Sequence, residues 1–276
     1  MQWEYALDLL RAMRRLGLQL TLMACTSAVT SLSCISWQRA LAVFHEIPRP
    51  NTVAYNAALS AAERGSQWEQ AMALLQDLLF LKMKQPAGTE SLRRLGPDQI
   101  SFSAAISACG AASRWQQSIA LLRSLPMHGL KADVVAYNAA ISAAALSESE
   151  EAFLAFDLAW ELFLEVTAAS LEPSMVTFNS AINAAEKARR WAEALMLLEL
   201  ARIDSEKLDG ISFNSAISAC EKCSEWRPAL SLLAAMGARG LACEAAACGP
   251  LLRSLEQQGL VSAEEELLQV LVSPAG

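Results

Sequence analysis

The chain has 276 residues, of which 54% are hydrophobic, and its formal net charge at pH 7 is −7. No uninterrupted apolar run reaches the roughly 18 residues that a membrane-spanning helix needs, so we expect no such helix. The seven cysteines are odd in number and scattered, which favours a reducing compartment over a disulfide framework. Alanine and leucine dominate the hydrophobic residues, and this composition favours closely packed helices over sheets.

The first predicted element is an amphipathic helix at 1–16, read from MQWEYALDLLRAMRRLG. This segment has neither the apolar core of a secretory signal nor the Ser/Arg-rich, acid-poor composition of a transit peptide. Trp3 followed by Ala6 matches the second half of the repeats described next. We therefore expect 1–21 to be a half repeat, with the chain starting late in a longer protein. The packing face of helix 1–16 would then lack its upstream neighbour.

The rest of the chain repeats itself. MVTFNSAINAAEKARRWAEAL (175–195) and GISFNSAISACEKCSEWRPAL (210–230) match position by position, 35 residues apart. A period between about 20 and 50 residues is the signature of a repeat architecture. An aromatic residue followed by a small polar one recurs along the chain, and a Trp recurs further into most units. These markers predict one solenoid over 1–276, with a half repeat at 1–21, repeats at 22–51, 52–98, 99–133, 134–174, 175–209 and 210–244, and a degenerate repeat at 245–276.

Each repeat is predicted to form two helices. In the second repeat, VAYNAALSAAE places Tyr55 and Leu59 at helical spacing, and WEQAMALLQDLL places Trp68 and Leu75 on one stripe. Gly129 and Gly240 end repeats and suit helix C-termini. Two long intervals are insertions at joints, LKMKQPAGTESLRRLGP between repeats and SESEEA between the helices of one repeat. The predicted fold class is an all-α solenoid of helix pairs.

Several repeats resemble those of the pentatricopeptide repeat family. The resemblance lies in VVAYNAAISAA (134–144), MVTFNSAINAAEK (175–187) and GISFNSAISACEK (210–222), and in the unit ends HGLKAD and SLEPS. A tetratricopeptide repeat would place its Trp in the first helix, whereas here Trp opens the second. The resemblance covers essentially the whole chain. It implies a right-handed superhelix of about fourteen helices that binds single-stranded RNA, one base per repeat, in a chloroplast or mitochondrion.

The resemblance also implies which residues read the RNA. The polar residue after the aromatic and the last residue of the unit form a base-reading pair, and the aliphatic two residues before the aromatic packs on the base. The base-reading pairs are Thr26 with Asn51, Asn56 with Asp98, Ser103 with Asp133, Asn138 with Ser174, Asn179 with Asp209, and Asn214 with Glu244. The first repeat departs from the pattern, because Cys25 stands where the aromatic residue is expected. The base-flanking residues are Met23, Val53, Ile100, Val135, Val176 and Ile211. By the family's pairing rules the first five repeats spell A-U-G-C-U, and the sixth adds a pyrimidine.

Two of these assignments have a simpler alternative. Asn, Asp and Ser are favoured N-cap residues, so helix capping alone explains the last residue of each unit. Arg64, Lys187 and Lys222 share one position near the ends of first helices and are candidate phosphate contacts. They are equally explained as solvated surface residues, and the acidic net charge lacks the basic footprint typical of a nucleic-acid binder.

Neither a metal site nor a catalytic site is predicted. Cys220, Cys223, Cys243 and Cys248 have a spacing that zinc could use, but Cys220 shares the repeat position of Cys109, so an interior small residue explains it. No nucleophile–base pair, deaminase motif or phosphate-binding glycine loop is present. We therefore expect a binding protein without cofactor, small-molecule substrate or membrane partner. The alternative to RNA binding is a protein-interaction scaffold that uses the same concave face.

Overall fold

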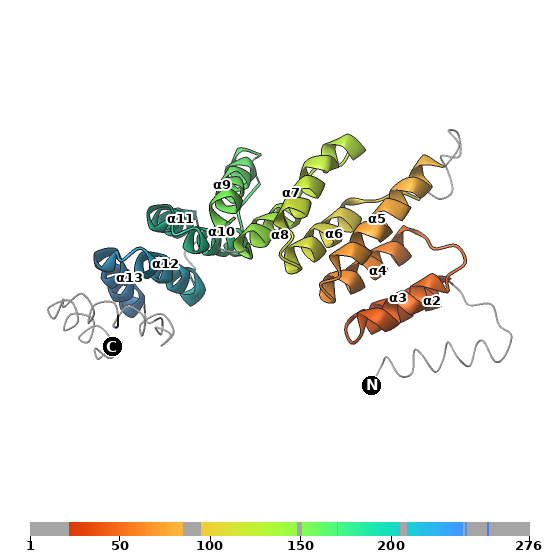
Figure 1. The fold of residues 1–276 in the computed structure, drawn as a ribbon, viewed down its shortest axis with the longest axis horizontal. Helices are drawn as coiled ribbons and strands as arrows, with labels where there is room; N and C mark the ends of the chain where they lie inside the picture. Colours follow the sequence, from red (N-terminus) through yellow and green to blue (C-terminus); the bar gives the residue numbers. More distant parts are fainter. Residues whose placement is uncertain are drawn as a thin grey trace. The chain divides into compact units, whose positions relative to one another are not determined.

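The computed structural model describes residues 22–84, 95–147, 151–169, 171–204 and 209–239, with the single positions 241 and 253. Across these residues it contains twelve α-helices, α2 to α13, one 3-10 helix and no strand (Figure 1). The predicted all-α solenoid of helix pairs is confirmed. The expected helix at 1–16 lies outside the described residues, as does the degenerate repeat at 245–276 apart from residue 253. The chain divides into two compact units, 1–143 and 144–276.

The first unit is a series of helix pairs that pack on their neighbours in chain order. First helices contact their own second helices and neighbouring first helices, so that α2 contacts α3 and α4, and α4 contacts α5 and α6. Each pair thus buries its apolar faces only against adjacent pairs, as a solenoid requires. The elements are α2 (Leu22–Ser33), α3 (Trp37–His45), α4 (Thr52–Arg64), α5 (Trp68–Met83), α6 (Gln99–Ala111), α7 (Trp115–Ser124), η1 (Leu125–His128) and α8 (Val134–Ala145), whose last two residues belong to the second unit.

Small residues let the first helices approach closely. Ala58 and Ala62 of α4 are fully buried beside Leu59, and each buried leucine of this kind stabilises the fold by about 1.5–3 kcal/mol. A close contact lies at Gly110 of α6, where a Cβ atom would lie 3.2 Å from the Cβ of Ala143 in α8. The predicted role of small residues at the helix crossings is therefore visible in the packing.

The second unit repeats this arrangement. Its helices are α9 (Ala152–Ala168), α10 (Met175–Lys187), α11 (Trp191–Asp204), α12 (Gly210–Lys222) and α13 (Trp226–Ala238). Helix α10 contacts α9, α11 and α12, and α12 contacts α11 and α13. The rings of Phe163 and Phe178 meet edge to face with centroids 5.4 Å apart, which joins α9 to α10.

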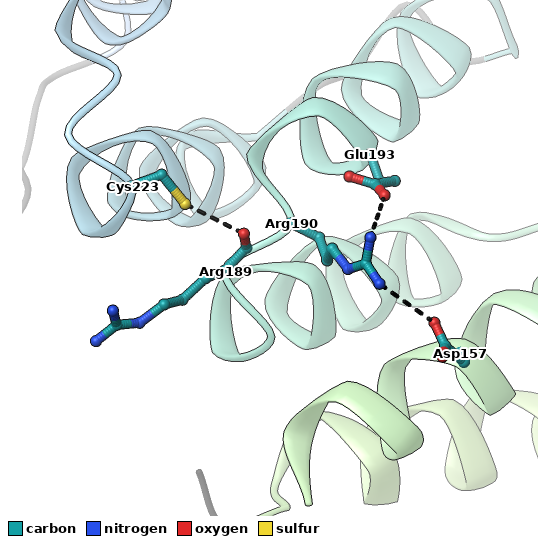
Figure 2. A network of polar contacts seen from close by, with 5 residues as sticks. All are labelled: Asp157, Arg189, Arg190, Glu193 and Cys223. Atoms are coloured by element: carbon teal, nitrogen blue, oxygen red, sulfur yellow. Dashed lines mark hydrogen bonds and ion pairs between the residues drawn. The ribbon is translucent and has the colours of Figure 1, made fainter. Parts of the chain in front are cut away.

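A polar network at the start of α11 fastens three elements of the second unit (Figure 2). The guanidinium of Arg190 lies 3.3 Å from Glu193 of α11 and 3.9 Å from Asp157 of α9. The preceding carbonyl, of Arg189, lies 3.1 Å from the Sγ of Cys223 at the end of α12. The Arg189 side chain points away from the other four residues in Figure 2. Because these ion pairs are partly exposed, each contributes about 1 kcal/mol or less.

The turn between the two helices has the same backbone conformation in four repeats. Ser66, Ser113, Arg189 and Ser224 all have positive φ, between 52° and 62°. In each turn the next amide donates to a carbonyl five residues earlier, as from Gln67 to Ala62 at 2.9 Å, which is the bond of a Schellman motif. Left-handed backbone costs a residue with a Cβ roughly 1 kcal/mol. The sequence analysis missed these turns because none contains glycine at that position.

Other joints agree with the sequence or refine it. Gly129 has φ +74° and follows η1, as expected for a C-terminal glycine, whereas Gly240 lies outside the described residues. Helix α5 continues through Met83, so the insertion at 81–97 begins as helix, and the SESEEA segment falls between α8 and α9. Helix α7 passes into η1 at Pro126, which has no backbone N–H to donate. None of the described helices is both long and apolar enough to cross a bilayer.

Candidate functional site

One aliphatic side chain at the start of every described first helix is exposed. These second-position residues have exposed fractions between 57% and 80%, whereas aliphatic side chains further along these helices, such as Leu59, Ile106 and Ile182, are fully buried. The residues are Met23, Val53, Ile100, Val135, Val176 and Ile211. The polar residue predicted to read a base follows three positions later in each helix, so the two lie on the same side of the helix. We call this pair of positions in the first helices the candidate face, and describe it within each unit.

In the first unit, Asn56 of α4 contacts the N-terminus of the next first helix. Its Nδ2 donates to both carboxylate oxygens of Asp98, each at 3.1 Å. Its Oδ1 accepts from the hydroxyl of Ser101, at 2.6 Å. The Ser101 side chain is fully buried, and its Oγ also accepts from the backbone N–H of Asp98 at 3.2 Å. The structure thus joins Asn56 and Asp98, which the sequence analysis had paired across 42 positions.

The same three-residue arrangement recurs in the second unit. Asn179 Nδ2 donates to Asp209 at 3.0 Å, and the buried hydroxyl of Ser212 donates to Asn179 Oδ1. The Ser212 hydroxyl also lies 2.8 Å from Asp209 Oδ1. Burial raises the pKa of Asp209, but hydrogen bonds from Ser212 and Asn179 outweigh burial and lower the pKa below its usual value. This carboxylate is therefore held ionised as a pure acceptor.

The other predicted pairs are placed differently. Thr26 Oγ1 donates to carbonyls of its own helix, at Leu22 and Met23, rather than to Asn51. Ser103 Oγ is buried and, among the described residues, has no hydrogen-bond partner. Asn214 Oδ1 is likewise buried and unpartnered among the described residues, and Glu244 lies outside them. Asn138 and Ser174 belong to different units and are not placed relative to one another.

The predicted N-caps are confirmed at the five described unit ends. In each case the side chain of the last residue of a unit accepts from the amide three positions later, at 2.8–3.3 Å. The residues are Asn51, Asp98, Asp133, Ser174 and Asp209. Capping and pairing are compatible, because a carboxylate has two oxygens: Asp209 Oδ1 caps α12 while its Oδ2 accepts from Asn179. Capping therefore fixes the carboxylate that the asparagine contacts.

Two of the three candidate phosphate contacts have partners within the fold. Lys222 Nζ lies 2.8 Å from Glu186 Oε1, in the preceding first helix of the same unit. Arg64 Nη1 contacts Cys34 and donates to Ser33 Oγ at 3.2 Å. Lys187 is exposed, and the structure records no ion pair for it among the described residues. Lys187 therefore presents the charge that is most available to a ligand.

The described cysteines are free thiols: Cys25, Cys109 and Cys220 are buried, Cys223 is partly exposed and Cys34 is exposed. Burial, followed by the nearby Cys223 and Glu225, raises the pKa of Cys220 to about 12. Burial alone raises the pKa of Cys109, at the same repeat position, to about 11. Cys243 and Cys248 lie outside the described residues. Among the described residues, no cluster of three His, Cys, Asp or Glu side chains is suited to a metal.

The sequence analysis missed the two serines that complete the asparagine contacts. Ser101 and Ser212 stand three residues after an N-cap, where a hydroxyl forms a capping box with the backbone N–H of the cap residue, as it does at Asp98. The signal was available in the repeat alignment, because Thr177 occupies the same position. Only the structure shows that both serine hydroxyls also reach the preceding first helix.

Comparisons with known proteins support the same architecture. The sequence model described as "Pentatricopeptide repeat domain" matches residues 120–187, and the one described as "PPR repeat" matches 176–202 and 211–241. No curated protein sequence matches the chain. Solved structures match with TM-scores above 0.5 but at 20% sequence identity or below, which establishes likeness of fold.

Three of these structures illustrate the likeness. The pentatricopeptide repeat protein PPR10 from maize matches with a TM-score of 0.57 and 20% identity, over 98% of this chain and 41% of that one. PPR10 in complex with an 18-nt psaJ RNA element matches with a TM-score of 0.54 and 20% identity, again over 98% of this chain and 42% of that one. The chain thus spans less than half the length of PPR10.

The PPR domain of Arabidopsis thaliana protein-only RNase P 1, in complex with tRNA, matches with a TM-score of 0.55 and 14% identity. The match covers 63% of this chain and 88% of that one. The recurring helix pairs, the matches to two repeat models and the solenoid likeness agree. The chain is a member of the pentatricopeptide repeat family.

Proposed function

We propose that the chain binds single-stranded RNA on the candidate face, with one base per repeat and with sequence selectivity. The observation that carries this proposal is the recurrence, in both units, of an exposed aliphatic side chain beside a hydrogen-bonded Asn–Asp pair. The solved structures of PPR10 with an RNA element and of the protein-only RNase P 1 domain with tRNA support it by likeness of fold.

The geometry suits a row of separated bases. Val53 and Ile100 stand at equivalent positions of α4 and α6, which pack on one another, and both are more than 60% exposed. A base held between two such side chains would bury apolar area on both of its faces. Base–aromatic stacking in other proteins contributes ~1–3 kcal/mol per base, and an aliphatic wall supplies part of that. The Asn amide three residues away then meets the edge of the base.

Asparagine can read a base edge because its amide both donates and accepts. In the Asn179 contact, Nδ2 donates to Asp209 and Oδ1 accepts from Ser212, which leaves one N–H and one lone pair free. A donor beside an acceptor complements uracil, which presents a carbonyl next to an N–H. Under the pairing rules implied by family resemblance, the pairs Asn56–Asp98 and Asn179–Asp209 both specify uracil.

Electrostatic attraction is expected to contribute little to affinity. The net charge of −7 opposes a polyanion, and Lys222 and Arg64 would have to exchange their internal partners for phosphate. We propose Lys187 as the principal phosphate contact, with Arg64 and Lys222 as secondary ones. A binder with so few cations has a shallow dependence of log K on log salt concentration, because each neutralised phosphate contributes one increment to the slope.

The biological role we propose is in organellar RNA processing, stability or translation, in a chloroplast or mitochondrion, without catalysis by this chain. The alternative, a scaffold that grips a peptide on the same face, is decided by the same experiment. A randomised RNA library is selected on the purified protein at low salt, and the enriched motif is confirmed by gel shift. The expected core is A-U-G-C-U. Failure of any RNA sequence to be enriched at low salt would favour the scaffold.

One substitution tests whether the candidate face reads bases. Asn179→Thr beside Asp209 should change the preference of one position from uracil to guanine, with a discrimination of about 1–2 kcal/mol, typical of one good base contact. Asn183→Thr makes the same change one turn further along α10 and serves as the matched control. Equal binding of both RNAs by parent and Asn179→Thr would show that Asn179 does not face a base.

A further inference from the structure

We infer that the hydroxyl at the third position of each following first helix determines base specificity by fixing the orientation of the reading asparagine. The residues are Ser101, which acts on Asn56, and Ser212, which acts on Asn179. They are positioning residues, since each acts through the asparagine. The inference rests on the proposed function, because it concerns how the candidate face discriminates between bases.

The donor and acceptor pattern allows only one orientation of the amide. A carboxylate has no proton to donate, so the group facing Asp98 must be the amide nitrogen of Asn56, and Nδ2 lies 3.1 Å from both carboxylate oxygens. The amide oxygen then faces Ser101, whose hydroxyl donates to it at 2.6 Å. Rotating the amide by 180° would place its oxygen against the carboxylate, so that two acceptors would face one another with no proton between them.

The fixed orientation of the amide also determines where its remaining N–H and lone pair point. When both inner contacts are satisfied, the remaining N–H and the remaining lone pair point in fixed directions toward a ligand. A base is favoured when its acceptor faces the free N–H and its donor faces the free lone pair. A base with the two groups exchanged would place donor against donor and acceptor against acceptor. Without the hydroxyl, the carboxylate still holds the nitrogen, but the oxygen has no partner and the side chain gains freedom to tilt. Discrimination should fall more than affinity.

Along the sequence, the type of base-reading residue can be compared with the residue at the third position of the next first helix. Asn56 and Asn179, whose Oδ1 atoms each accept from a hydroxyl, are followed by Ser101 and Ser212. The hydroxyl readers Thr26 and Ser103 have no amide to orient, and alanine stands in the third position after them. Asn214 provides the converse case. Its Oδ1 has no partner among the described residues, and the sequence offers Ala247 at the equivalent position.

The alanines at this position also show that the hydroxyl is dispensable for the fold. Ala54 and Ala136 occupy it in two repeats, and their amides still donate to the N-cap side chains of Asn51 and Asp133, at 2.9 and 2.8 Å. Ser212→Ala therefore keeps the backbone N-cap bond to Asp209 and removes only the hydroxyl contacts. Ser212→Thr restores a hydroxyl and is the conservative rescue, since Thr177 already stands at this position in the preceding repeat.

The test uses the full chain and a randomised RNA library. Asn179→Ala first identifies the base position that this repeat reads, as the one whose preference disappears. Ser212→Ala should reduce the preference at that same position by roughly two- to tenfold, the value of one hydrogen bond, and leave the other positions unchanged. Ser212→Thr should restore the preference. In the Asn179→Ala background, Ser212→Ala should have no further effect. An unchanged preference in Ser212→Ala, or an equal loss at all positions, would overturn the inference.

A second measurement needs no RNA. Carboxyl ¹³C NMR titration of Asp209 should show a higher pKa in Ser212→Ala than in the parent, and side-chain ¹⁵N spectra should show faster exchange of the Asn179 amide protons. If the parent enriches no RNA but both NMR changes occur, the proposed function fails while the orientation of the amide by Ser212 stands. If the exchange of the Asn179 amide protons is unchanged, the hydroxyl does not hold the amide, whatever the RNA result, because the Asp209 pKa also reports a bond from the hydroxyl to that carboxylate.

Discussion

Gly65, at the end of α4, lies directly against Trp37, the first residue of α3. A Cβ atom on Gly65 would stand 2.4 Å from Cδ1 and 2.5 Å from Cγ of the indole. Both atoms are close to the tryptophan backbone, so the ring cannot avoid the new methyl by a small rotation at its far end. The contact joins adjacent repeats of the first unit. It also explains why glycine occupies this position, because a φ of −85° is accessible to any residue and does not itself require glycine.

Gly65→Ala is therefore expected to destabilise the protein by ~1–3 kcal/mol, the cost of overpacking a close contact. The matched control is Gly237→Ala in α13, where a Cβ would meet nothing within 4 Å and alanine should stabilise the helix by up to about 1 kcal/mol. Urea unfolding followed by circular dichroism measures both variants. Equal midpoints for the two would contradict the packing explanation.

Glycine should be favoured at the left-handed turns. Ser113→Gly and Ser224→Gly remove a Cβ from residues with φ of 56° and 62°, and each is expected to stabilise the fold by about 0.5–1 kcal/mol. Ser231→Gly, on the exposed side of α13, is the control and should destabilise by a similar amount, because glycine is a poor helix former. The thermal midpoint distinguishes the two classes by the sign of its change.

The Asp209 carboxylate should make stability depend on pH. Because its folded-state pKa is lowered, its contribution is fully present above the unfolded value near ~3.9 and is lost as the pH falls through the folded value. Asp209→Asn should therefore be less stable than the parent at pH 7, by less than about 1 kcal/mol for this partly exposed group. The difference in free energy of unfolding should shrink between pH 5 and pH 3. A difference that stays constant across this range would contradict the assigned hydrogen bonds.

The cysteines should differ in reactivity. Cys34 is exposed, whereas burial raises the pKa of Cys220 to about 12 and that of Cys109 to about 11. In the native protein at pH 7.5, iodoacetamide should modify Cys34 first and leave Cys109 and Cys220 untouched until urea is added, because the thiolate is the reactive form. Peptide mass spectrometry reads each site separately. Early labelling of Cys220 would show that α12 opens or that a thiolate is stabilised there.

The sequence predicts the helix pairs and their N-caps because these depend on local patterns repeated every 35 or so residues. Asn51 and Asp209 each precede a helix in the sequence, and the structure shows both as caps. The left-handed turns could not be predicted, since serine and arginine give no signal there. The contact from Asn56 to Ser101 was also beyond a pattern argument. It depends on how closely two first helices approach one another, and a local sequence pattern does not give that distance.

The contact among Asn179, Asp209 and Ser212 also determines where repeats can be recombined without separating its members. Asn179 lies in one sequence repeat and Ser212 in the next, so a crossover at the boundary between Asp209 and Gly210 separates the asparagine from its hydroxyl. A crossover at the aromatic instead, at Phe178 and again at Phe213, moves the segment 179–212 with all three members together. Under the proposed function, gene duplication or deletion with this frame would add or remove one complete base-reading unit. Chimaeras joined at the aromatics should inherit the specificity of each donor segment, whereas those joined at repeat boundaries would create new and unmatched readers.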